Sequence, residues 1–265
     1  MPYINVKDLS KDFLRSDADG KPQVFHALHD VNFEIERGEF ICLLGFSGCG
    51  KSTVLNLLAG FLQPSSGQIT IDGKPVRKPS PKYVTIFQNY GLLPWKNIRK
   101  NVELGLSAKR FNGLTKKKKG AIADKYLDLV GLSALANSMP CQLSGGQQQR
   151  VAIARGLAVN PDILFMDEPF GALDAVTRIK LQDDLLRIVR EENKTVIFVT
   201  HDIEEAVYLA DRIFVMKSNP GHIEEIIPVR IPRPRDRNSP DFNDKRKQIF
   251  NKLFSISENQ VEYII

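Results

Sequence analysis

One stretch near the N-terminus constrains the fold more than any other, because it requires a strand, a loop and a helix in that order. Residues 45–52 read Gly-Phe-Ser-Gly-Cys-Gly-Lys-Ser and match the pattern G-x-x-x-x-G-K-[ST]. The apolar run 41–44 before it predicts a buried strand, and residues 52–59 after it predict a helix. The glycines allow the loop to wrap around phosphate oxygens with its N–H groups pointing inward. The stretch therefore predicts a nucleotide-binding α/β fold.

Two side chains of this loop have specific expected roles. Lys51 supplies a point charge for the β- and γ-phosphates, and the Ser52 hydroxyl is a ligand for Mg²⁺. The alternative, a glycine-rich turn with a solvated lysine, is disfavoured by the strand before the loop and the helix after it. The residues expected to hold the phosphates are Gly45, Phe46, Ser47, Gly48, Cys49, Gly50, Lys51, Ser52 and Thr53.

A second apolar run, residues 163–166, ends in two carboxylates, Asp167 and Glu168. A continuous apolar run fits a strand that is buried on both faces, and its C-terminal end would lie at the edge where open α/β sheets bind ligands. Asp167 is the expected Mg²⁺ partner through water, because Mg²⁺ keeps part of its hydration shell. Glu168 is expected to orient or deprotonate the attacking water. The alternative for such a pair standing alone is the start of a polar loop.

A second anion-binding helix start is predicted at residues 143–147, Leu-Ser-Gly-Gly-Gln, which run into a helical segment. Ser144 can cap this helix, while Gly145 and Gly146 leave backbone N–H groups accessible. These N–H groups and the helix dipole both favour negative charge, and Gln147 completes the segment. An ordinary capped helix without a ligand is the alternative.

Composition narrows the class of protein. The chain has 265 residues, of which 42% are hydrophobic, and no apolar run approaches the ~20 residues that cross a bilayer. We expect no secretory signal, and three cysteines suit a reducing compartment. The net charge is +6, but the basic residues do not interleave with aromatics, so nucleic acid is not an expected partner. The lysines at 116–119 predict a solvated helix start, with attraction to an anionic membrane as the alternative.

The order of the expected elements predicts an α/β core interrupted by a helical insert. Strands are expected at 31–36, 41–44, 67–73, 82–87, 163–167, 196–200 and 212–216, with an edge strand at 224–229. Helices are expected at 98–107, 121–131, 144–159, 174–192 and 242–254. The core then covers about 1–90 and 160–229, a helical subdomain covers about 91–159, and a Pro/Arg linker with a terminal helix covers about 230–265.

The motifs in this order resemble the ATP-binding subunit of an ABC transporter, over about residues 4–253. The resemblance implies a RecA-like P-loop NTPase core with an N-terminal antiparallel β subdomain and an inserted α-helical subdomain. It implies ATP and Mg²⁺ as cofactors, and residues 143–147 resemble the ABC signature.

The resemblance also implies roles for single residues. Gln88 links Mg²⁺ and the attacking water to the transmembrane partner, and His201 senses the γ-phosphate. Asp174 belongs to the loop 171–174, which crosses the dimer interface. Phe13 is the aromatic that stacks on adenine, although the insertion at 14–23 makes Phe25 a competitor.

Family members work as pairs, which accounts for two anion sites in one chain. The phosphate loop of one subunit and the signature of another hold each ATP, so the resemblance implies a homodimer or a pair with a sister ATPase. It also implies integral-membrane permease subunits, an extracytoplasmic solute-binding protein, and a peripheral place on the cytoplasmic face of the inner or plasma membrane. Exporter and non-transport ABC ATPases are the rivals. The lack of a spanning segment argues against exporters, and a single ATPase unit argues against the non-transport class.

The finer similarity is to the nitrate/sulfonate/taurine/bicarbonate group of importers. The strings that carry it are residues 87–95, 169–174 and 233–237. It implies uptake of a small anionic solute, while thiamine-precursor and aromatic-acid importers look alike in these motifs. Two departures from the group's pattern are Gln148-Gln149 after the signature and Met139-Pro140-Cys141 before it, and the first of these leaves the exact subgroup open.

Overall fold

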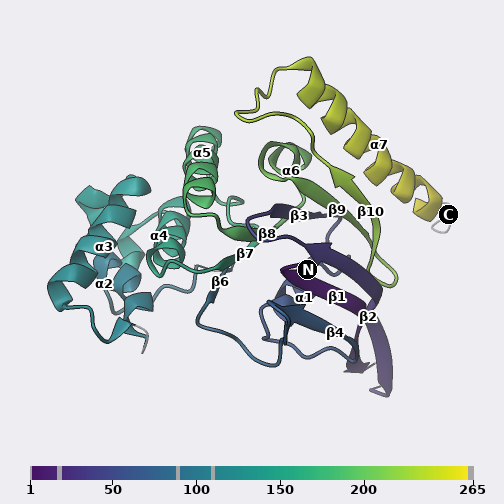
Figure 1. The fold of residues 1–265 in the computed structure, drawn as a ribbon, viewed down its shortest axis with the longest axis horizontal. Helices are drawn as coiled ribbons and strands as arrows, with labels where there is room; N and C mark the ends of the chain where they lie inside the picture. The colour runs from purple at the N-terminus through teal and green to yellow at the C-terminus, as the bar shows by residue number, and fades with distance from the viewer. Residues whose placement is uncertain (1, 17–19, 88–89, 109–110, 262–265) are drawn as a thin grey trace. The chain divides into compact units, whose positions relative to one another are not determined.

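The computed structural model describes residues 2–16, 20–87, 90–108 and 111–261. The chain divides into two compact units: Met1–Pro79 with Val196–Ile265, and Ser80–Thr195. Both units contain strands and helices (Figure 1). None of the helices within the described ranges combines the length and the apolar character of a membrane span.

The first unit contains an antiparallel sheet of four strands. These are β1 (Ile4–Ser16), β2 (Pro22–Ile35), β4 (Ser66–Ile71) and β5 (Lys74–Pro75), in the order β2-β1-β4-β5. The expected strand at 31–36 is only the end of the long β2. The turn between β4 and β5 holds Asp72 and Gly73 at φ 53° and 70°, the left-handed pair that a tight hairpin requires. The Asp-Gly hairpin signal is thus confirmed.

The same unit contains four further strands, which supply the expected buried core. These are β3 (Phe40–Leu44), β8 (Thr195–Thr200), β9 (Arg212–Lys217) and β10 (His222–Pro228). β3 runs parallel to both β8 and β9, and β10 pairs antiparallel with β9. Every residue of β3 and β8 is buried, as their continuous apolar runs predict.

Three helices complete this unit: α1 (Lys51–Leu58), α6 (Ile203–Leu209) and α7 (Pro240–Val261). α7 is longer than the expected 242–254 and contacts α6. It buries Phe242, Ile249 and Leu253, whose spacing places them on one face of the helix. Figure 1 shows α7 in yellow at the C-terminal end of the chain.

The segment expected to be a Pro/Arg linker packs against the rest of the first unit. Arg235 is only 6% exposed. Its guanidinium donates hydrogen bonds to backbone carbonyls at the end of α6 and beyond β10, those of Val207, Tyr208, Ala210, Val229 and Ile231. Arg233 pairs with Asp211 at 2.9 Å, and the Arg237 guanidinium lies 3.4 Å from the centre of the Tyr208 ring. These contacts attach the start of α7 to α6.

The second unit combines a parallel strand pair with helices. β6 (Tyr83–Ile86) runs parallel to β7 (Ile163–Asp167). The helices are α2 (Ile98–Glu103), α3 (Lys116–Leu129), α4 (Gly145–Ala158) and α5 (Ala175–Glu191), with short 3-10 turns η1 (Gly105–Ser107), η3 (Ser133–Leu135) and η4 (Pro140–Gln142). α2, α3 and α4 contact one another. The expected helix 98–107 divides into α2 and η1, and the lysine run forms the first turn of α3.

Candidate functional site

The phosphate loop lies between β3 and α1, the strand-before and helix-after context that the motif predicts. Gly48 and Gly50 have φ angles of 82° and 98°, which only glycine adopts without strain. A Cβ on Gly45 would lie 2.7 Å from both the Cys49 sulfur and the Met216 carbonyl oxygen. The glycines are therefore required by the path of the loop.

Lys51 is the first residue of α1 and is only 6% exposed. Its Nζ donates hydrogen bonds to the carbonyls of Gly45 and Phe46, at 2.8 and 2.9 Å. The N-cap of α1 is Gly50, which has no side chain to occupy the first-turn amides. A buried ammonium beside an uncapped helix N-terminus favours a phosphate at this point.

Burial also determines the acidity of the cysteine in the phosphate loop. Cys49 is 1% exposed, and burial raises the pKa of its thiol although the Lys51 ammonium nearby opposes the shift. The Lys51 Nζ lies 3.9 Å from its sulfur. Burial likewise raises the pKa of Cys42 on β3, whereas Cys141 is exposed.

His201 follows β8 at the same sheet edge. Leu44 and Thr200 are register partners in the parallel pair β3 and β8, so Gly45 and His201 continue from the same end of neighbouring strands. The Thr200 hydroxyl donates to the Glu205 carboxylate at 2.8 Å and accepts the Asp202 N–H at 3.0 Å. The first unit therefore holds the phosphate loop and the predicted γ-phosphate sensor on adjacent strands.

The two candidate adenine-stacking residues lie opposite each other in the β1–β2 hairpin. Phe13 and Phe25 are register partners in an antiparallel pair, so both side chains project from one face. The Lys11 Nζ lies 5.2 Å from the Phe13 ring centre, and the Arg15 guanidinium lies 3.7 Å from that of Phe25. The register explains why the sequence pattern supports either aromatic.

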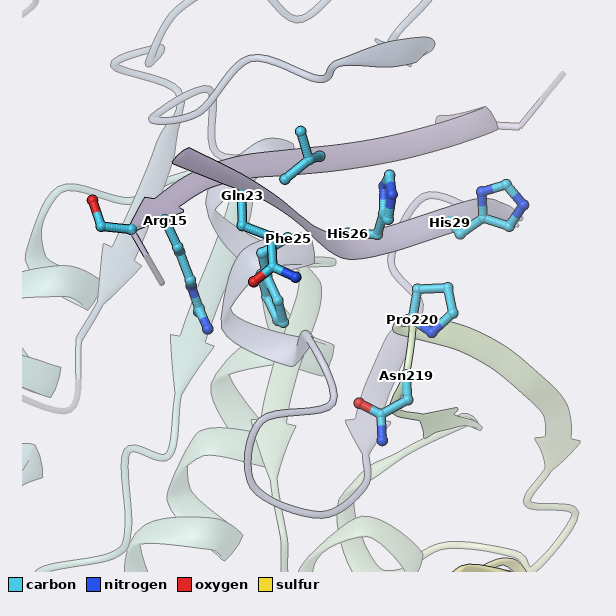
Figure 2. Close-up of a pocket in the computed structure, with 9 residues that line it drawn as sticks. Arg15, Gln23, Phe25, His26, His29, Asn219 and Pro220 are labelled. Atoms are coloured by element: carbon cyan, nitrogen blue, oxygen red, sulfur yellow. The ribbon is translucent and has the colours of Figure 1, made fainter. Parts of the chain in front are cut away.

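A hollow of about 720 Å³ lies beside this hairpin, and of its lining residues only Phe25 was a candidate from the sequence (Figure 2). Its lining residues are Arg15, Ser16, Gln23, Val24, Phe25, His26, His29, Asn219 and Pro220. Gly221 connects this hollow to the phosphate loop: its N–H donates to the Ala27 carbonyl at 3.1 Å, and a Cβ on it would lie 2.5 Å from the Cys49 carbonyl oxygen. A planar group in the hollow would therefore lie near the phosphate loop.

In the second unit, the predicted acidic pair follows the buried part of β7. Asp167 is the last residue of β7, and Glu168 comes next with a φ of 46°. A glutamate in the left-handed region is strained, and such strain is concentrated at functional sites. The expected Mg²⁺ donors, the Ser52 hydroxyl and the Asp167 carboxylate, are hard oxygen ligands of the kind Mg²⁺ prefers. Gln88, the third expected metal residue, lies outside the described residues.

The signature segment forms the predicted capped helix start. The Ser144 hydroxyl accepts the Gln147 N–H at 3.3 Å, and the Gln147 side chain accepts the Ser144 N–H at 2.9 Å. This reciprocal pair is a capping box at the start of α4. A Cβ on Gly145 would lie 2.7 Å from the Tyr90 hydroxyl, so a larger residue there would require the Tyr90 side chain to shift.

The loop 171–174 lies next to this helix start. A Cβ on Gly146 would lie 3.1 Å from the Ala172 carbonyl oxygen. Asp174 is the N-cap of α5 and accepts the Thr177 N–H at 3.0 Å. Hydrogen bonds from Thr177 hold the pKa of Asp174 below its ordinary value. The second unit thus brings the signature and the predicted dimer-interface loop together.

Comparisons with known proteins agree with this geometry. A protein-family model described as "ABC transporter" matches residues 28–171. The chain is 49% identical over 214 residues to the nitrate import ATP-binding protein NrtD of Synechococcus elongatus, covering 80% of this chain and 78% of the relative. It is 44% identical over 252 residues to the bicarbonate transport ATP-binding protein CmpC of the same species, covering 93% of this chain and 37% of the relative.

A solved structure extends the similarity to the fold. It is described as a dimeric, post-hydrolysis state of the ATP-binding cassette MJ0796 bound to ADP and Pi. The TM-score is 0.78 at 35% identity, with 86% of this chain and 99% of that chain covered. The predicted class, a RecA-like P-loop NTPase fold, is confirmed.

Proposed function

The chain belongs to the ABC transporter family of ATPases, and from that premise we propose that it is the ATP-hydrolysing subunit of an importer for a small anionic solute. The observation that carries the ATPase role is the buried Lys51 ammonium beside the uncapped start of α1, in the loop between β3 and α1. The similarity to import proteins for nitrate and bicarbonate supports an anionic solute. Import of a thiamine precursor or an aromatic acid is the alternative.

The hydrolytic step is proposed to use the phosphate loop, Glu168 and His201. The loop amides and Lys51 bind the β- and γ-phosphates and offset the charge that develops during transfer. Glu168 orients the attacking water and accepts its proton, while His201 donates a hydrogen bond to the γ-phosphate. Bound Mg²⁺, held by Ser52, Asp167 and Gln88, would neutralise phosphate charge.

The base is proposed to stack on Phe13. Phe25 lies opposite Phe13 on the same face of the hairpin and holds the Arg15 guanidinium against its ring. The Arg15 guanidinium lies 3.7 Å from the Phe25 ring, whereas the Lys11 ammonium lies 5.2 Å from the Phe13 ring, so Phe13 is the less covered platform for adenine. Loss of nucleotide affinity in Phe13→Ala, with a smaller loss in Phe25→Ala, would support this assignment, and the reverse order would contradict it.

Each complete site is proposed to need two chains, because one chain carries two anion-binding helix starts. The starts are those of α1 and α4, in different units. Two chains, or one chain and a sister ATPase, would close with the phosphate loop of one against Ser144–Gln147 of the other. The dimeric state described for MJ0796 supports this arrangement.

In the cell, this pair would bind two integral-membrane permease subunits on the cytoplasmic face of the membrane, and an extracytoplasmic protein would select the solute. The core at about 1–90 and 160–229 would carry the nucleotide, and the helical part at about 91–159 would contact the permease. The terminal segment at about 230–265, a Pro/Arg stretch followed by α7, packs on α6 of the first unit.

A mixing experiment tests the shared site. Lys51→Ala and Ser144→Ala chains are each expected to hydrolyse ATP poorly. A mixed pair contains one site with both residues intact, so mixing should restore a substantial part of the wild-type phosphate release. If mixing restores nothing, although both variants are folded and pair, the two-chain site is wrong.

A transport experiment tests the solute. A strain that lacks this gene should lose uptake of one labelled anion among nitrate, bicarbonate and taurine. The wild-type gene should restore that uptake, and the Glu168→Gln gene should not. Normal uptake of all three anions in the deletion strain would contradict the proposed solute class.

A further inference from the structure

The C-terminal helix α7 reaches the phosphate loop through an aromatic contact. The Phe254 ring lies 6.0 Å from the Phe46 ring, centre to centre, at an interplanar angle of 88°. This is the edge-to-face geometry that aromatic pairs prefer. Phe250, one helical turn earlier, stacks on Phe254 at 4.1 Å. Two aromatics of α7 therefore support one side chain of the loop.

Helix α7 is anchored to the rest of the first unit, and this anchoring holds the aromatic contact in place. Its other face is buried through Phe242, Ile249 and Leu253, and the segment before it is attached by the buried Arg235. Arg246 also lies 3.9 Å from Glu204 on α6, at one side of a hollow of about 850 Å³ that His201 lines as well. Phe254 is therefore held in place by the contacts that attach α7 to the rest of the first unit.

The backbone carbonyl of Phe46 competes with phosphate for the same hydrogen-bond donors. Its carbonyl accepts a hydrogen bond from the Lys51 Nζ at 2.9 Å and one from the Cys49 N–H at 3.4 Å. Both donors belong to the set that phosphate oxygens would use in a loop of this type. A bound phosphate must therefore draw these donors toward itself, away from the Phe46 carbonyl.

We propose that Phe254 is a positioning residue that restrains the phosphate loop through Phe46, so that α7 opposes nucleotide binding. The aromatic contact stabilises the loop arrangement in which the Phe46 carbonyl retains Lys51 and Cys49. An edge-to-face pair contributes enough to change an equilibrium about twofold to tenfold. The inference rests on the proposed nucleotide site and adds an internal restraint on it.

The test is ADP binding to the full-length chain, measured by calorimetry with Mg²⁺ present. ADP carries the β-phosphate but gives no hydrolysis. Phe254→Ala should lower the Kd for ADP about twofold to tenfold, and Phe254→Tyr, which keeps the ring, should bind as the wild type does. Asn251→Ala, an exposed change on the same helix, is the matched control and should also bind as the wild type does.

A double-mutant cycle tests whether Phe254 acts through Phe46. In a Phe46→Ala background, Phe254→Ala should have no further effect on the Kd, because the partner ring is absent. Unchanged or weaker ADP binding by folded Phe254→Ala, while the wild type binds ADP normally, would overturn this inference alone. Failure of the wild type to bind ADP would overturn the proposed function and this inference with it.

Discussion

Leu44 and Thr200 face each other as register partners in two neighbouring parallel strands, and the predicted phosphate loop and His201 both follow directly from this pair. The position of His201 thus depends on the hydrogen bonds of Thr200. Its hydroxyl links the Asp202 N–H to the buried carboxylate of Glu205. These bonded residues flank His201, the predicted γ-phosphate sensor, in the sequence.

Thr200→Val should therefore lower both stability and turnover. The change removes the hydrogen bond from the Thr200 hydroxyl to the buried Glu205 carboxylate, which costs about 1–3 kcal/mol in the free energy of unfolding. Urea unfolding measures the stability, and phosphate release measures kcat. Thr200→Ser keeps the hydroxyl and serves as the control. Wild-type stability in Thr200→Val would show that this hydrogen bond is unimportant.

Substitutions of Glu168 should lower the rate of hydrolysis, whereas glycine at this position should raise the stability of the fold. Glu168→Gln and Glu168→Gly should both retain ATP binding and lose hydrolysis by roughly 100-fold or more, since the water loses its base. Because residue 168 has a φ of 46°, glycine should relieve strain, and Glu168→Gly should unfold with a free energy about 1 kcal/mol above that of Glu168→Gln. Normal turnover in Glu168→Gln would contradict the assignment of the base.

The cysteines should react with alkylating reagents in a fixed order. The exposed Cys141 should be modified first, and Cys49 slowly, because the thiolate is the reactive form and burial raises the pKa of Cys49. A raised pKa means less thiolate near neutral pH, so the rate at Cys49 should climb as the pH increases. Cys141→Ser isolates this rate for mass spectrometry. ATP should slow it further, and an absence of protection by ATP would count against the phosphate loop.

Arg235 should be needed for the attachment of α7. Arg235→Met removes the donors to five carbonyls and should lower the free energy of unfolding by about 3 kcal/mol or more. Arg235→Lys should rescue little, because an ammonium cannot reproduce the planar guanidinium fork. Limited proteolysis near residues 236–240 should become faster in both variants. Arg230→Met, an exposed change in the same segment, should behave as the wild type does.

Local patterns predicted the buried core strands and the helix caps, although they missed β1 and β5 and gave only the end of β2. The reciprocal bonds of Ser144 and Gln147, and the glycines of the phosphate loop, follow from a few adjacent residues whose backbone needs are specific. These parts of the candidate site could be predicted because the interactions are short in sequence.

Contacts between distant segments could not be predicted in the same way. Nothing near Phe46 in the sequence indicates Phe254, and the Pro/Arg composition of residues 230–237 suggested a linker although Arg235 is buried. The choice between Phe13 and Phe25 stayed open because the strand register, which pairs them, depends on the whole hairpin. Tertiary packing decides such features, and composition does not encode it.

The starts of α1 and α4 differ, and this difference sets the order in which the two helices meet the nucleotide. α1 begins at Gly50 without a side-chain cap and carries the Lys51 ammonium, whereas in α4 the Ser144 hydroxyl already accepts the N–H of Gln147. Under the proposed function, nucleotide should therefore load on α1 before it meets α4 of another chain. Free chains would then hydrolyse ATP at a rate that rises with the square of their concentration. A permease that binds two of them would replace that dependence with a fixed local concentration.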